Sequence, residues 1–216
     1  MSEVLIIELV VIMVYMTVWF LVAQALKRND VADIAWGIGF IVTAISVIVF
    51  TASITWRGLL ALLLVTLWGV RLAFHVFLRN RRKGEDPRYR NWRKKWGKHV
   101  KVRAYFQVFI LQGVLIIVIS LPVTRAIKYG QSPLNLLDLL GVFVWFGGFF
   151  FEAVGDYQLS KHKRDPANRG KIMTQGLWKY TRHPNYFGEV ALWWGVYLIA
   201  VSVPLGWATI LGPITI

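Results

Sequence analysis

The chain has 216 residues, 56% of them aliphatic or aromatic, and a formal net charge of +14 from 25 Lys and Arg against 11 Asp and Glu. It contains no Cys, which excludes disulfides, thiolate zinc sites and cysteine nucleophiles. The apolar composition and the 11 Trp residues indicate an integral membrane protein instead of a soluble domain.

Six segments are apolar enough to cross a bilayer, which requires about 20 mostly apolar residues. In chain order they are Val4–Leu26, Ile34–Ile54, Gly58–Leu78, Ala104–Val123, Leu134–Leu159 and Tyr186–Ser202. A seventh apolar segment, Leu205–Ile216, is too short to cross alone, and we expect the chain to be incomplete at this end. We therefore predict an all-α polytopic transmembrane helix bundle with six spans plus a truncated seventh, forming a single integral membrane domain over residues 1–216.

Positive charge is unequally divided between the two ends of the predicted spans. The segments after the first, third and fifth spans, residues 27–28, 79–103 and 160–185, hold 21 of the 25 Lys and Arg residues, and the opposite side holds three. The positive-inside rule then puts the N-terminus outside and the basic loops 79–103 and 160–185 in the cytoplasm. Because these charges flank spans, we interpret them as a topology signal with added attraction to anionic membrane lipids, and we predict no nucleic-acid partner.

Five ionisable residues lie inside apolar stretches and at a similar depth. They are Arg71 and His75 in the third span, Glu152 and Asp156 in the fifth, and Glu189 in the sixth. Helical spacing groups them with neighbours on three faces: Trp68, Arg71 and His75; Glu152, Asp156 and Lys163; Asn185, Glu189 and Trp193. A purely structural ion pair of Arg71 with one acid would leave the other acids without an obvious partner. Intramembrane charges are usually functional, so we predict a polar cavity that opens to the cytoplasm.

The basic loops and the start of the sixth span suggest an anionic ligand that carries phosphates and an aromatic ring. Lys163 and Arg164 are suited to phosphate oxygens, which guanidinium groups bind in a bidentate fork. No Rossmann or Walker motif is present; Gly37 and Gly39 lie inside a span, where we interpret them as helix-packing residues. Pro184 can open the sixth helix, because its missing N–H is harmless in the first turn.

Residues 156–193, with Asp165–Gly170 and Arg182–Glu189 as the densest motifs, resemble the steroid 5α-reductase-like membrane family, in particular its bacterial branch. The similarity extends to residues 33–37, 67–71 and 80–89, and sterol C14-reductases have a similar Arg, His, Asn and Tyr order. The resemblance implies an integral protein of the bacterial inner membrane that binds NADPH on its cytoplasmic side and reduces a carbon–carbon double bond of a lipidic, steroid- or isoprenoid-like substrate.

Candidate residues follow from this resemblance and from the motifs. The cofactor-binding candidates are Asp33, Arg71, Asp156, Lys163, Arg164, Arg182, His183, Asn185, Tyr186, Glu189 and Trp193. The catalytic candidates, as proton donors after hydride addition, are Tyr186, Glu189 and His183, each of which can instead hold the cofactor. We predict no metal site. The steroid reductases carry Tyr where this chain has Trp68, and an indole donates a hydrogen bond but is no practical acid, so their mechanism does not transfer unchanged.

Two other functions remain open. S-adenosylmethionine-dependent isoprenylcysteine and phospholipid methyltransferases also have a small bundle with an Arg-His-Pro-x-Tyr motif before a late span, although Asn185, Gly188 and Glu189 favour the reductase. A non-catalytic lipid-binding protein would bind no nucleotide. Sterol, polyprenoid, fatty acyl enone and quinone-like lipids all suit an apolar pocket, and the oligomeric state is not readable from the sequence.

Overall fold

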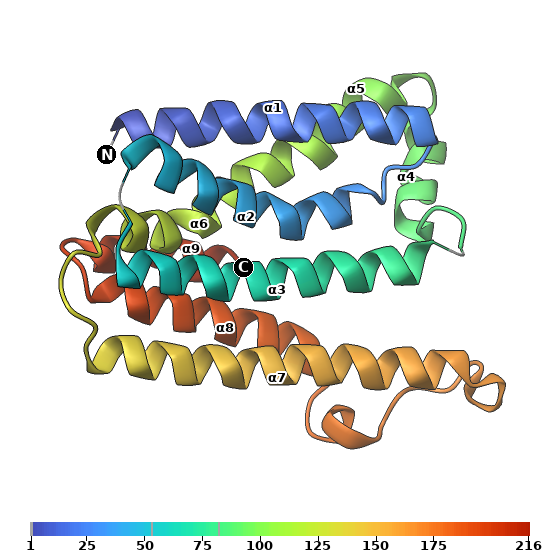
Figure 1. Cartoon of the computed structure of the whole chain (residues 1–216). Helices are drawn as coiled ribbons and strands as arrows, with labels where there is room; N and C mark the ends of the chain where they lie inside the picture. The colour runs from blue at the N-terminus through green and yellow to red at the C-terminus, as the bar shows by residue number, and fades with distance from the viewer. Residues whose placement is uncertain (1, 53, 82) are drawn as a thin grey trace.

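The computed structural model describes residues 2–52, 54–81 and 83–216, and all the regular structure in these ranges is helical. Six long helices make up most of the molecule in Figure 1: α1 (Ser2–Leu26), α2 (Ala32–Thr51), α3 (Trp56–Asn80), α6 (Leu111–Tyr129), α7 (Leu136–Arg164) and α8 (Pro184–Val201). The shorter elements are α4 (Pro87–Trp96), α5 (Val100–Ala104), a π-helix (Tyr105–Ile110), α9 (Leu211–Thr215) and 3-10 turns at Gly97–His99, Pro166–Asn168, Gly176–Lys179 and Gly206–Ile210. Ser53 of the second predicted span and Arg82 of the first basic loop lie outside the described residues.

The prediction of an all-α membrane protein is confirmed. Five helical stretches in the described part of the chain are long and apolar enough to cross a membrane: Glu3–Leu26, Ala32–Thr51, Trp56–Asn80, Pro87–Tyr129 and Leu136–Arg164. Each overlaps one of the first five predicted spans, although the second was expected to continue to Ile54 and the fifth to begin at Leu134. The predicted sixth span forms α8, which is not among these five; it has 18 residues and carries polar Asn185 and Glu189 in its first turns. The predicted seventh segment forms the 3-10 turn at Gly206–Ile210 and α9.

Both predicted basic loops are partly helical. Residues 87–96 form α4, which begins with Pro87 in its first turn and with Asp86 accepting a hydrogen bond from the backbone N–H of Arg88 at 2.9 Å. α7 likewise continues through Lys161–Arg164, where cations suit the negative end of the helix dipole. The thickness of a bilayer sets the length of the apolar stretch but not the length of the helix. The helix can continue into water because Lys and Arg are good helix formers.

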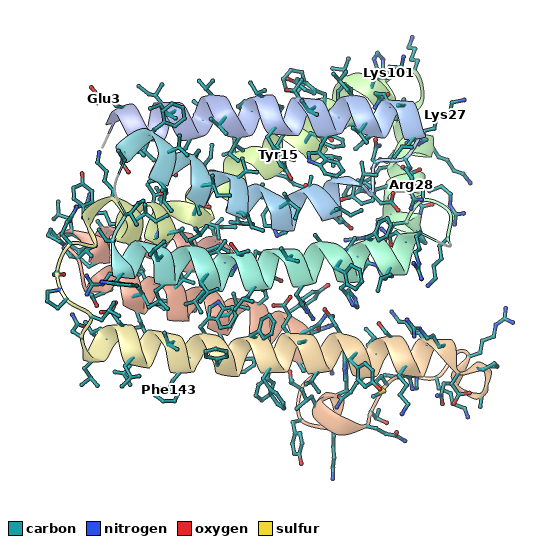
Figure 2. All side chains as sticks on the ribbon, viewed as in Figure 1. Glu3, Tyr15, Lys27, Arg28, Lys101 and Phe143 are labelled. Atoms are coloured by element: carbon teal, nitrogen blue, oxygen red, sulfur yellow. The ribbon has the colours of Figure 1, made fainter. Side chains whose placement is uncertain are left out.

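The bundle has one strongly basic end. Figure 2 shows Lys27, Arg28 and Lys101 at one end of the molecule and Glu3 at the other. We call the first the basic end; α3 and α7 run towards it and α8 runs away from it (Figure 1). At the opposite end the fully buried Arg57 of α3 donates to both carboxylate oxygens of Asp138 in α7, at 2.8 and 2.7 Å.

Glycines let the helices that carry the ionisable residues approach closely. A Cβ added at Gly37 of α2 would lie 2.6 Å from the carbonyl oxygen of Gly69 in α3, which confirms the helix-packing interpretation of Gly37. A Cβ at Gly148 of α7 would lie 2.5 Å from the carbonyl oxygen of Gly188 in α8. The backbones of α7 and α8 therefore pack against each other directly, and this brings the first turns of α8 against the acidic turns of α7.

Candidate functional site

Arg71 joins two acids of a different helix. Its Nη1 donates to Glu152 at 2.6 Å and its Nη2 donates to Asp156 at 2.7 Å, so one guanidinium of α3 bridges two carboxylates one turn apart on α7. The side chain of Glu152 is 4% exposed, that of Asp156 13% and that of Arg71 18%. The cluster is thus deepest at Glu152 and more open at Arg71. Arg71 thus pairs with two of the intramembrane acids at once, because its planar fork serves both.

Trp68 completes the deep side of this cluster. Its indole N–H donates to the second oxygen of Glu152 at 2.8 Å, and the Trp68 side chain is fully buried. Glu152 therefore has a partner on each oxygen and is held in one orientation. Sequence reasoning named Glu152 as an intramembrane charge but omitted it and Trp68 from the candidate site. The helical spacing of Trp68 and Arg71 was the signal that placed both on one face.

Asn185 links α8 to the cluster. Pro184 opens α8 as predicted, and Asn185 in the next position donates its Nδ2–H to Asp156 at 3.1 Å. Its Oδ1 is buried and has no hydrogen-bond partner among the described residues. The close approach of Gly155 to the Asn185 backbone, where an added Cβ would lie 3.1 Å from the Asn185 nitrogen, fixes this position. The site thus holds a buried amide acceptor whose orientation is set by Asp156.

Glu189 lies one turn further along α8 and is half-buried. It is close enough to Asp156 and Arg71 for their charges to act on it, but it makes no hydrogen bond or ion pair with any residue that the structure describes. One guanidinium therefore faces three carboxyl groups, those of Glu152, Asp156 and Glu189. His75, one turn beyond Arg71, has its Nε2 3.9 Å from Asp156 and extends the cluster towards the basic end.

Cations line the side of the cluster that faces the basic end. The charges of Arg79 of α3 and Arg164 of α7 both act on His75, so the last turns of these two helices lie near it. Lys163 and Arg164 are exposed in the last turn of α7. The arrangement runs from a buried carboxylate at Glu152, through Arg71 and His75, to exposed cations.

Asp33 belongs to a separate cluster. It accepts a hydrogen bond from the phenol of Tyr89 at 2.6 Å and lies 3.2 Å from Arg88 and 3.5 Å from Arg79. Arg79 lies two helical turns beyond Arg71, which is roughly 12 Å along α3. Asp33 pairs with Arg79 and is therefore displaced from the Arg71 cluster towards the basic end. Through Tyr89 it anchors α4 to the start of α2. Next to it, burial opposes ionisation of Asp86, but hydrogen bonds from Arg88 outweigh this and hold the pKa of the Asp86 carboxyl below its usual value.

The other predicted residues lie on the surface or in the apolar core. Arg182, His183 and Tyr186 are exposed, and the rings of His183 and Tyr186 stack with centroids 5.1 Å apart. Trp193 is fully buried against Phe40 and Trp68, with ring centroids 4.8 and 5.3 Å away. Trp193 thus packs on the apolar side of the Trp68–Glu152 hydrogen bond, while His183 and Tyr186 lie outside the buried cluster.

A cavity of about 360 Å³ lies between the last turns of α7 and the segment that follows it. Its lining residues are Gln158, Lys161, His162, Asp165, Asn168, Met173, Gln175 and Gly176. Gln158 is two residues after Asp156, and two residues correspond to about 200° around a helix. The cavity therefore faces away from the Arg71 cluster, on the opposite side of α7.

The comparison with protein families gives one match. Residues 19–216 match the model of a family described as "Protein of unknown function (DUF1295)". No curated protein and no solved structure matches the chain. The matched region contains every candidate residue described above, and it covers far more than half of the sequence. The chain therefore belongs to the DUF1295 family of proteins of unknown function.

Proposed function

We propose that the protein is a membrane-embedded, NADPH-dependent reductase that transfers a hydride to a carbon–carbon double bond of a lipidic substrate. The proposal rests on the resemblance to the steroid 5α-reductase-like family and on the charged cluster of α3, α7 and α8. The observation that carries it is the buried Oδ1 of Asn185, which has no hydrogen-bond partner in the described part of the chain and belongs to a side chain that Asp156 holds in place.

The chemistry of Asn185 fits the carboxamide of a nicotinamide. A buried acceptor without a partner is unfavourable, and an amide N–H from a ligand would satisfy it. Asp156 orients the Asn185 side chain by accepting its N–H, and Arg71 in turn fixes Asp156. The acceptor is therefore preorganised by two successive contacts, and binding need not order it first.

The charges also suit this cofactor. When bound, NADPH supplies a hydride and is left with a positively charged ring. Asp156 and Glu189 place carboxyl groups where such a charge would be stabilised, and a single guanidinium only partly offsets them. Towards the basic end, Lys163, Arg164 and Arg79 offer cations to phosphate groups, including the 2′-phosphate that distinguishes NADPH from NADH.

Glu189 is the proton donor in this proposal. Reduction of the double bond needs a hydride at one carbon and a proton at the other. Trp68 has its N–H engaged by Glu152, and Tyr186 and His183 are exposed, whereas Glu189 is half-buried beside Asn185 and without a partner in the described ranges. Its carboxyl group can give up a proton and recover one from water through the more open side of the cluster.

The proposed orientation follows from the basic end. We infer that this end faces the cytoplasm of a bacterial inner membrane, with six spans, α8 included, and the N-terminus on the other side. The cofactor would then reach the cluster from the cytoplasm, and the lipidic substrate from the bilayer.

Titration calorimetry of the purified protein in detergent tests the proposal. We expect binding of NADPH, weaker binding of NADH and poor binding of S-adenosylmethionine. Asn185→Ala and Glu189→Gln should each weaken NADPH binding roughly five- to 150-fold, the effect of losing a buried hydrogen bond worth about 1–3 kcal/mol.

The matched control is Asn135→Ala, because Asn135 caps α7 at the opposite end of the bundle. This variant should lose melting temperature but keep NADPH affinity. Tight binding of S-adenosylmethionine without NADPH would move the protein to the methyltransferases. Binding of neither would leave a lipid-binding protein, and normal NADPH affinity in Asn185→Ala would refute the site assignment.

A further inference from the structure

The short helix α4 lies across the end of the bundle. Figure 1 shows α4 at the ends of α1, α2 and α3 and running across the direction of these long helices. Helices that cross a bilayer run through it, so a helix placed across their ends lies along the membrane surface. α4 and the 3-10 turn at Gly97–His99 are therefore at the level of the lipid headgroups.

One face of α4 is used by the protein itself. Tyr89 is buried and donates to Asp33 at 2.6 Å, and Arg93 donates to Glu85 at 2.9 Å. Trp96 is also buried, and the half-exposed Trp92 stacks on it with ring centroids 5.7 Å apart. These contacts fix the rotation of α4, and they place a Trp pair at the depth that Trp prefers in membranes.

The other face carries cations that pair with no anion of the described ranges. Its members, which we call the outer basic face, are Arg90, Lys94 and Lys95 of α4 and Lys98 of the 3-10 turn that follows. All four are exposed, and their side chains make no hydrogen bond or ion pair with any described residue. The segment from Pro87 to Ala104 contains no Asp or Glu. Like charges four residues apart, such as Arg90 and Lys94, destabilise a helix. A surface of this kind needs anions from outside the chain.

The position of the outer basic face separates it from the candidate site. In Figure 1 the segment between α7 and α8 lies on the side of α7 that faces away from α3, whereas α4 lies at the ends of α1, α2 and α3. A ligand held at the Arg71 cluster by Lys163 and Arg164 does not account for the charges of α4. The nearest abundant anions for a helix along the membrane surface are phospholipid headgroups.

We propose that the outer basic face binds the phosphate groups of anionic phospholipids in the surrounding bilayer, with Trp92 and Trp96 setting the depth of α4. The four side chains are spread over about two turns of helix, so they can reach several headgroups at once. This binding is independent of the proposed reductase activity and uses no residue of the candidate site.

The test uses the full chain in phosphatidylcholine vesicles that contain a trace of spin-labelled lipid. The fraction of spin label immobilised at the protein is measured once with labelled phosphatidylglycerol and once with labelled phosphatidylcholine, and the two fractions are compared. We expect a preference for phosphatidylglycerol that high salt weakens. Arg90→Gln/Lys94→Gln/Lys95→Gln/Lys98→Gln should reduce this preference by about five-fold or more, the factor for one basic residue at an anionic surface.

The matched control removes four exposed cations from the segment after α7: Lys161→Gln/Arg169→Gln/Lys171→Gln/Lys179→Gln. It should retain the preference, and an equal loss in the control would overturn the proposal. The proposal would also be overturned if inorganic phosphate displaced the labelled lipid more strongly than NaCl does at equal ionic strength. That result would indicate a soluble phosphate ligand. If the quadruple variant does not fold, Lys94→Gln/Lys95→Gln should give a smaller loss, and an unchanged preference would refute the assignment.

Discussion

The indole N–H of Trp68 donates to a carboxylate oxygen of Glu152 at 2.8 Å, although the two residues are 84 positions apart in the chain. This bond fixes the deepest carboxylate of the candidate site from the apolar side, while Arg71 holds its other oxygen. Trp68 therefore acts as a positioning residue for Glu152. Its N–H is engaged by Glu152 and is not free to donate to a substrate.

Trp68→Phe should destabilise the protein because it leaves one oxygen of the buried Glu152 without a donor. The expected loss is about 1–3 kcal/mol in the free energy of unfolding, which denaturation in detergent measures. Trp145→Phe is the matched control: Trp145 is equally buried, but its indole N–H has no partner among the described residues. Both variants lose the same volume, so an equal loss of stability would contradict a specific role for the Trp68 hydrogen bond.

Gly148→Ala should separate α7 from α8, because the new Cβ would lie 2.5 Å from the carbonyl oxygen of Gly188. Overpacking of this kind costs about 1–3 kcal/mol, and the shift should also weaken NADPH binding, since the close packing of α7 and α8 brings Asn185 and Glu189 to the cluster. Gly147→Ala is the control, because a Cβ at the neighbouring glycine meets nothing within 4 Å. Thermal unfolding and NADPH titration on both variants check this; comparable effects at the two positions would refute the close-packing argument.

Arg71→Lys should lower both stability and NADPH affinity. A single ammonium cannot reproduce the fork that reaches Glu152 and Asp156 at 2.6 and 2.7 Å, so one of the two carboxylates loses its charge-assisted hydrogen bond, at a cost of about 1–3 kcal/mol. Arg57→Lys makes the same change in the buried ion pair with Asp138 at the opposite end. Its stability should fall similarly while NADPH affinity stays at the wild-type value. If Arg57→Lys weakened NADPH binding as much, the effect of Arg71→Lys would be attributable to stability alone.

The proposed topology predicts that reporter fusions after Lys95 and after Asn168 both report the cytoplasm. The reason is the concentration of Lys and Arg in residues 79–103 and 160–185. Alkaline phosphatase and fluorescent-protein fusions measure the side directly. A fusion after Gln131 should report the other side, and opposite results for Lys95 and Asn168 would exclude a bundle in which α3 and α7 run to the same membrane surface.

Much of the fold was predictable from the sequence, because the signals are local. The length of an apolar stretch gives a membrane helix, and Pro184 gave the start of α8 to within a turn. The fifth span was predicted to end at Leu159, whereas α7 continues through Arg164, since hydropathy marks where the apolar stretch ends and not where the helix ends. That Arg71, Glu152 and Asp156 lie at a similar level of the bundle was also predictable, because this level follows from position along a span.

The tertiary structure decided which of these side chains meet. Sequence periodicity shows which residues share a face of a helix, but not which neighbouring helix that face contacts. The contacts between α7 and α8 depend on how closely their glycines let the two backbones approach. That packing brought Asn185 to Asp156, left Glu189 without a protein partner in the described part of the chain, and moved Asp33 to a separate cluster with Tyr89. Depth in the membrane is a one-dimensional property that a sequence carries, whereas the contacts of Arg71 require the rotation and spacing of three helices, which only their packing fixes.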